Sequence, residues 1–165
     1  MVMVRDVLPV VGHLSRVPEV AELLRSRCAA AVSCEASAVL VPDGDVWRVS
    51  AGAHMRPLEE RLQITAEHWL VSEIVRAGHG VLIRDTDVAR TRLSGAPLAS
   101  WPNLLALPIP EVDAIVLLAR KTKAFGRGDL TKGRQAIGQA AIQLREAFDV
   151  RSLARALSAF VDPVD

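Results

Sequence analysis

The 165-residue chain contains no tyrosine, only two cysteines and no long hydrophobic run. A membrane-spanning helix needs about 18 or more consecutive apolar residues, and no such run is present. The N-terminus also lacks the charged, apolar and cleavage-site regions of a secretory signal. Cys28 and Cys34 are too few for a four-ligand metal site or a disulfide framework. We therefore expect a soluble, cytoplasmic protein.

An excess of charge of either sign is also missing. The 20 Lys and Arg residues nearly balance the 19 Asp and Glu residues, and the net charge is +1. The chain therefore has no broad electrostatic footprint for nucleic acid or an anionic membrane, and we expect neither as a partner. Half of the residues are apolar, which suffices for one core. We predict a single domain over 1–165, with a core at about 17–148 and helical extensions at 1–16 and 149–165.

Hydrophobic periodicity predicts alternating groups of helices and strands. Thr65 is the expected N-cap of the third helix, Gly78 its end, and Asp129 the start of the last helical region. The predicted helices are 7–15, 18–33, 66–77 and the region from 129 onward. The predicted strands are 36–41, 46–51, 81–83, 104–109 and 114–119, with a turn at 42–45 and a long irregular segment at 84–101.

The last helical region carries two apolar stripes that are out of phase. Either the chain breaks at Asp149, or the second stripe packs against another subunit. We favour the second explanation, which predicts a homodimer. The first stripe is Ile137, Ala141, Leu144 and Phe148, and the second is Val150, Leu153, Leu157 and Phe160.

Several segments resemble stretches of GAF domains, a family of small sensory and signalling modules. They are Asn103-Leu-Leu-Ala-Leu-Pro-Ile-Pro, Ile115-Val-Leu-Leu-Ala, Phe125-Gly-Arg-Gly-Asp129-Leu, and Leu70 to Ala77 followed by Gly78-His-Gly-Val-Leu-Ile-Arg-Asp85. The resemblance covers roughly residues 19–148. It implies an α/β (α+β) fold with a central six-stranded antiparallel sheet flanked by helices, the N- and C-terminal helices packing together. It also implies a ligand pocket between the sheet and a helix.

The chain departs from several ligand-specific patterns of that family. It lacks the Asn-Lys pair of cyclic-nucleotide-binding members, and Leu130 stands where they carry an acidic residue after the aspartate. No cysteine follows Cys34, which argues against a covalently attached bilin. The cysteines Cys28 and Cys34 are misplaced for the sulfoxide reductases of the family. No cofactor is identified, and the absence of a catalytic motif predicts that the chain is not an enzyme.

Six residues are the predicted ligand-binding set: Trp69, Trp101, His68, Asp85, Arg84 and Leu105. Amphipathic indole rings often line small-molecule pockets, although core packing is the simpler role for Trp69. Arg84 and Asp85 belong to a charged loop cluster with Asp87, Arg90 and Arg92, which is either a carboxylate or phosphate site or a solvated loop. A histidine near the pocket could ligate haem iron, with His68 favoured over His54 and His79.

The leading prediction is a stand-alone sensory domain that binds an unidentified small ligand and signals through a dimer or a partner protein. The alternative is a ligand-free scaffold whose core is filled by side chains. The two differ in whether the positions around Trp69, Trp101 and Asp85 enclose an open cavity or interdigitate.

Overall fold

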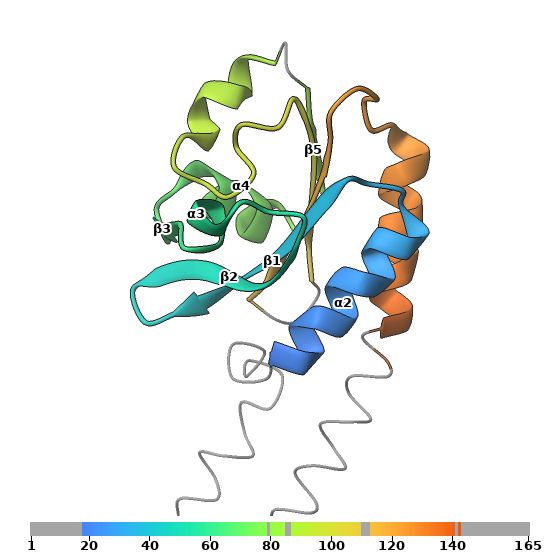
Figure 1. Cartoon of the computed structure of the whole chain (residues 1–165), viewed down its shortest axis with the longest axis horizontal. Helices are drawn as coiled ribbons and strands as arrows, with labels where there is room; N and C mark the ends of the chain where they lie inside the picture. The colour runs from blue at the N-terminus through green and yellow to red at the C-terminus, as the bar shows by residue number, and fades with distance from the viewer. Residues whose placement is uncertain (1–17, 79, 85–86, 110–112, 141, 143–165) are drawn as a thin grey trace, which may run out of the picture.

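The computed structural model describes residues 18–78, 80–84, 87–109, 113–140 and 142. Six strands form one antiparallel sheet in the order β3-β2-β1-β6-β5-β4. Helix α2 (Pro18–Ala31) and the helical residues 127–140 lie side by side against one face (Figure 1). Helix α4 (Trp69–Ala77) and the 3-10 helix η2 (Val88–Leu93) cover the other face (Figure 1), and the short α3 (Pro57–Glu60) contacts β2. The predicted α+β fold with a six-stranded antiparallel sheet is confirmed.

Five of the six strands lie where the hydrophobic pattern predicts them. They are β1 (Ala36–Asp43), β2 (Val46–Ala53), β4 (Val81–Ile83), β5 (Asn103–Pro108) and β6 (Ile115–Arg120). The sixth, β3 (Gln63–Thr65), pairs with the outer side of β2 and buries only Ile64. An edge strand of three residues with one buried side chain has no detectable period, so the sequence analysis did not locate it. The predicted helix 7–15 and the second apolar stripe lie outside the described residues.

The β1–β2 hairpin has a tighter turn than predicted. The strands continue to Asp43 and resume at Val46, so Gly44 and Asp45 alone form the loop. Gly44 has φ +66°, which is the left-handed conformation that two-residue hairpin loops require and that glycine adopts without a steric penalty. The turn therefore fixes the register of the neighbouring pairs, from Asp43 with Val46 to Leu40 with Val49, and a bulge between Leu40 and Val39 shifts it.

The three central strands are buried on both faces. All six residues of β6 and the first six of β1 are buried, as expected when helices cover both sides of a sheet. Successive residues belong to different clusters: Val116 and Leu118 pack toward α2, whereas Ile115 and Leu117 pack toward α4. The cluster under α2 also contains Ala136, Ile137 and Ala140, so the first and last described helices pack together as predicted.

Helix α4 begins at Trp69, three residues later than predicted. Thr65 is not its cap, because Thr65 ends β3 and pairs with Val46. His68 takes that place: its Nδ1 accepts a hydrogen bond from the backbone N–H of Leu70 at 3.1 Å. Gly78 ends the helix as predicted, with φ +69° and its N–H donating to the carbonyl of Ile74.

The last helix begins at residue 127 rather than at Asp129. The carbonyl of Gly126 accepts hydrogen bonds from the N–H groups of Asp129 and Leu130. The Asp129 carboxylate accepts a hydrogen bond in return from the N–H of Gly126, at 2.8 Å. Asp129 is therefore the third residue of the helix. A carboxylate there can accept a hydrogen bond from a free backbone N–H, and its negative charge interacts favourably with the positive end of the helix dipole.

Candidate functional site

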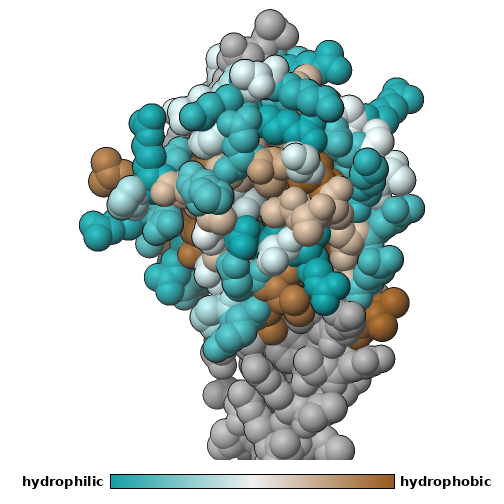
Figure 2. Space-filling model, turned by 45° about the vertical axis from the view of Figure 1, so that its right-hand side comes forward, coloured by the Kyte–Doolittle hydropathy of each residue, from teal (hydrophilic) through white to brown (hydrophobic). Residues whose placement is uncertain are grey.

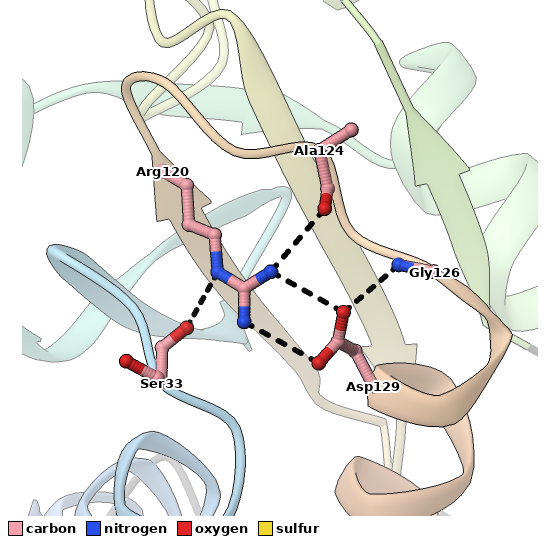
Figure 3. A network of polar contacts seen from close by, with 5 residues as sticks. All are labelled: Ser33, Arg120, Ala124, Gly126 and Asp129. Carbon is pink, nitrogen blue, oxygen red and sulfur yellow. Dashed lines mark hydrogen bonds and ion pairs between the residues drawn. The ribbon is translucent and has the colours of Figure 1, made fainter.

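A buried arginine links three segments of the chain at the end of β6. Arg120 is 6% exposed, and its guanidinium donates to the carbonyl of Ser33 at 2.6 Å and to that of Ala124 at 3.3 Å. It also forms a two-point ion pair with the Asp129 carboxylate, at 3.2 and 3.3 Å. Figure 3 shows these contacts, which link the residues after α2, the end of β6 and the start of the last helix.

This Arg120 network accounts for the Phe-to-Asp turn that the sequence analysis singled out. The Arg120 guanidinium carbon lies 4.2 Å from the centroid of the Phe125 ring, which is itself buried. Burial would raise the pKa of the Asp129 carboxyl, but the hydrogen bonds from Gly126 and Arg120 hold this pKa below its ordinary value. Phe125 and Asp129 are therefore fixed by one arginine, and the turn is held as a unit.

The same end of the sheet carries an open pocket. The register places the start of β1, the end of β2, the start of β5 and the end of β6 together, because neighbouring strands are antiparallel. The pocket has a volume of about 390 Å³. We call it the Trp101 pocket. It is lined by Glu35, His54, Arg56, Glu59, Ser100, Trp101, Pro102 and Lys121.

Alternation along β6 separates the pocket from the Arg120 network. Val116 and Leu118 pack toward α2, and Arg120 follows on the same side. Lys121, one residue later, lines the pocket, and its ammonium lies 5.5 Å from the centroid of the Trp101 ring. Two adjacent basic residues therefore serve different faces of the molecule.

Within the described part of the chain, the carboxylates of the Trp101 pocket accept hydrogen bonds from neutral donors. Glu35 accepts from the backbone N–H of Lys121 at 3.1 Å. Glu59 accepts from the Ser100 hydroxyl and from the backbone N–H of Arg56, each at 3.4 Å. Among the described residues, no ion pair joins an acidic and a basic side chain of this pocket.

His54 has an unusual backbone conformation at the rim of the pocket. Its φ is +59°, in the left-handed region that residues with a Cβ rarely adopt. Leu98, one turn before Trp101, has φ +64°, and its carbonyl accepts a hydrogen bond from the Trp101 N–H. Conformations of this kind cost on the order of 1–3 kcal/mol each and concentrate at binding and catalytic sites.

Of the five predicted ligand residues that the structure describes, one lines this pocket. Trp101 lines it. Trp69 packs against the cluster under α4, on the same side of the sheet. Leu105 is fully buried in the cluster under α2, on the opposite side, so it is not placed with Trp101. A continuously apolar strand does not reveal which of its residues faces which layer.

His68 has a structural role in which both ring nitrogens are used. Nδ1 accepts from the Leu70 N–H, so Nε2 carries the proton and donates to the Ser94 carbonyl at 2.9 Å. Iron ligation would require a free ring nitrogen and would break one of these bonds. His79 lies outside the described residues, and His54 is exposed at the pocket.

Arg84 and Asp87 of the predicted charged loop are hydrogen-bonded to each other. The Arg84 N–H donates to the Asp87 carboxylate at 2.8 Å, and the Asp87 N–H donates to the Arg84 carbonyl at 3.1 Å. Asp85 lies outside the described residues, and Arg84 is exposed. The hydrogen bonds assign Asp87 to the turn itself, a common use of aspartate in loops.

Both cysteines are held in surroundings that favour the thiol. Burial, with a smaller contribution from Cys34, raises the pKa of Cys28 to about 12. Burial also raises the pKa of Cys34, although Arg120 and Arg25 act in the opposite direction. A thiol that stays protonated is a poor nucleophile.

The pocket charges were missed by the sequence analysis, apart from His54. Glu35, Arg56, Glu59 and Lys121 come from three distant segments, and none belongs to a recognisable motif. Among the described residues, no three His, Cys, Asp or Glu side chains gather as a metal site. None of the described helices combines the length and hydrophobicity that crossing a lipid bilayer requires.

No family model and no curated protein sequence matches the chain. Its similarities are to solved structures. A GAF domain/HD domain protein from Geobacter sulfurreducens has a TM-score of 0.63 at 16% identity, with 85% of this chain and 98% of that chain covered. The blue-light absorbing form of the Thermosynechococcus elongatus PixJ GAF-domain has a TM-score of 0.63 at 14% identity, covering 89% and 95%. The GAF domain of an Acinetobacter phosphoenolpyruvate-protein phosphotransferase has a TM-score of 0.60 at 12% identity, covering 90% and 96%.

These similarities define the class of the molecule, an α+β domain with helices on both faces of an antiparallel sheet. Its fold is that of a GAF domain, and the resemblance noted in the sequence is confirmed at the level of the fold.

Proposed function

We propose that this chain is a sensory domain that binds a small molecule in the Trp101 pocket and passes the binding event to its flanking helices. The GAF-like fold supports a regulatory role, because one of the similar structures is a light-absorbing GAF domain and another belongs to a phosphotransferase. Fold alone does not define a function, so the proposal depends on the pocket.

The observation that carries the proposal is a pocket of about 390 Å³ with an indole wall and charged groups at its rim. This volume lies within the range of about 300–1,000 Å³ that is usual for small-molecule sites. The Arg120 network lies next to this pocket and can respond to a ligand that binds there. Glu35 and Lys121 line it, and Arg120, next to Lys121, bonds to Ser33 and Asp129.

This adjacency provides a route from the pocket to the helices. A ligand that moves Lys121 moves the end of β6, where Arg120 holds the start of the last helix. The same arginine holds the segment that follows α2. We propose that ligand binding changes the relative position of these two helices. A second copy of the chain or a separate protein then recognises the change, and the domain itself catalyses no reaction.

The second copy is proposed on the sequence pattern of the last residues. Val150, Leu153, Leu157 and Phe160 form an apolar stripe that lies outside the described residues. Figure 2 views the molecule obliquely from the side of α2 and the last helix, where hydrophilic residues surround a smaller apolar patch. We place the subunit contact on the stripe, because apolar residues at helical spacing pack against a partner helix.

Native mass spectrometry with an absorption spectrum, on protein purified from its own host, tests both parts. We expect a dimer that retains a small molecule, and we expect Leu153→Asp with Leu157→Asp to give a monomer, since charges in an apolar seam are unfavourable. A monomeric wild type would contradict the dimer. A haem absorption band would identify the ligand. The iron ligand would then be a histidine other than His68, since both ring nitrogens of His68 are hydrogen-bonded in this structure.

A ligand-free scaffold is the second candidate, and the core beneath α4 favours it. Leu70, Ile74 and Leu98 are fully buried there, in one cluster with the sheet residues Leu40 and Leu104. An apo protein from its own host that also binds no compound in solution would support this scaffold and contradict the sensory proposal.

A further inference from the structure

We propose that the Trp101 pocket binds a zwitterion of amino-acid size, with the ammonium of the ligand held by carboxylates and the ligand carboxylate held by basic side chains. The inference rests on the sensory function proposed above and adds the chemical class of the ligand. It follows from the way charges are arranged around the pocket.

The pocket presents charges of both signs that do not neutralise one another. Glu35 and Glu59 carry the acidic groups, and Arg56, Lys121 and His54 are the basic residues. Elsewhere in the described chain, opposite charges that lie close together do pair, as in Arg25 with Glu22, Arg48 with Asp43 and Arg120 with Asp129. In this pocket the same groups face a common space without an ion pair. A ligand with both charges would satisfy both sets.

The carboxylates are positioned for an ammonium group. Glu35 and Glu59 each accept hydrogen bonds from neutral donors, which orient the carboxylate without cancelling its charge. Each oxygen of a carboxylate can accept more than one hydrogen bond, so acceptor capacity remains. An ammonium has three donors and no acceptor, and it fits such a pair of acceptors.

Lys121 supplies the complementary half of the site. Its ammonium lies 5.5 Å from the Trp101 centroid, within the range of a cation–π contact. A ligand ammonium can occupy the same ring face, and Lys121 is then released to bond the ligand carboxylate. Arg56, which also lines the pocket, offers a planar group that binds carboxylates at two points.

A ligand with a single charge would use only half of this arrangement. A carboxylate without an amine would meet Glu35 and Glu59 as like charges, and an amine without a carboxylate would meet Arg56 and Lys121. Like charges brought together in a partly enclosed site repel each other. The pocket therefore favours the zwitterion over either singly charged analogue.

Isothermal titration calorimetry with the standard L-amino acids, added one by one to the full chain, is the first experiment. For the tightest binder, the deaminated carboxylic acid and the decarboxylated amine are then compared with the parent. We expect each analogue to bind at least about tenfold more weakly, since each loses charge-assisted hydrogen bonds. An analogue that binds as tightly as its parent amino acid would overturn the zwitterion.

Nuclear magnetic resonance locates the binding, because the chain has three tryptophans and hence three indole N–H signals. We expect the Trp101 signal, assigned with Trp101→Phe, to shift on titration, while the signal of Trp47 in the core stays in place. A shift confined to Trp47 or Trp69 would place the ligand elsewhere and overturn the site.

Substitutions test the two halves of the site separately. Glu35→Gln and Arg56→Gln should each weaken binding at least about tenfold. The matched control Arg48→Gln removes an exposed arginine at the far end of β2 and should leave affinity unchanged within about twofold. Circular dichroism verifies that each variant is folded. Equal affinity in all three variants would overturn the assignment.

Failure of this inference is distinguishable from failure of the proposed function. If no amino acid binds, but a different molecule is retained from the host and shifts the Trp101 signal, the zwitterion is wrong and the sensory function stands. If no molecule is retained and none binds, both are wrong.

Discussion

Arg120 and Lys121 are adjacent in sequence, and their surroundings differ as much as those of two basic residues can. Arg120 is buried, paired with Asp129 and bonded to two carbonyls. Lys121 is exposed and faces an open pocket with acidic groups that it does not pair with in this structure. The comparison separates a charge that stabilises the fold from a charge that is available to a ligand. Burial and the number of satisfied bonds distinguish the two.

The largest expected difference in the free energy of unfolding is between the variant that removes Arg120 and the variant that removes Lys121. Arg120→Met should lower the free energy of unfolding by about 2–4 kcal/mol, because Asp129 and two carbonyls lose their partner in a partly buried site. Lys121→Met should change it by less than about 0.5 kcal/mol. Urea denaturation of both variants measures the difference. Equal losses would break the comparison.

The acidic partner of Arg120 should show a smaller effect that depends on pH. Asp129→Asn should lower the free energy of unfolding by about 1–3 kcal/mol at neutral pH. The pKa of Asp129 in the folded protein is below its ordinary value of 3.8, so its ionised form is favoured by folding. The stabilisation is therefore complete above the unfolded pKa. It is lost as the pH falls from about 5 through the unfolded value to the lower folded value.

Urea denaturation of wild type and Asp129→Asn from neutral to acidic pH checks this prediction. The gap between the two should narrow as the pH falls through that window. Asp43→Asn, at the exposed pair with Arg48, is the matched control and should follow the wild type closely. A gap that stays constant down to the lowest pH would show that the Asp129 charge is not responsible.

The two described histidines extend the comparison, with the smallest expected effect. His68→Ala should cost about 1–2 kcal/mol, because the Leu70 N–H at the start of α4 and the Ser94 carbonyl both lose a partner. His54→Ala retains the left-handed backbone, removes no described hydrogen bond, and should change stability by less than about 0.5 kcal/mol. Thermal denaturation distinguishes them, and a larger loss for His54→Ala would reverse the assignment of roles.

Local signals in the sequence predicted most of the fold. Long apolar runs located β1, β5 and β6, and the turn at Gly44 located the hairpin. The start of α4 was misplaced because histidine is an uncommon cap, and its role depends on Ser94, far along the chain. The pattern of a fully buried strand does not show which residues face which side of the sheet. Leu105 was therefore grouped with Trp101, although the two lie on opposite sides of the sheet.

The candidate site was harder to predict than the fold, for a different reason. Trp101 was identified because large amphipathic rings often line small-molecule pockets. The charges around it come from three stretches of chain that only the antiparallel register brings together. Exposed charged residues are common in any sequence, so no local pattern distinguishes Glu35 or Lys121 from a solvated surface residue.

The pairing of β1 with β6 has a consequence for synthesis of the chain. The first three strands form one half of the sheet, the last three form the other, and β1 and β6 join them, with Ala36 opposite Ala119. As the chain leaves the ribosome, β1 is complete long before its second neighbour exists. The backbone groups on the free edge of β1 stay unpaired until β6 is made. During most of the synthesis of the chain, this edge can therefore pair with a wrong strand, and the pairing with β6 removes that possibility.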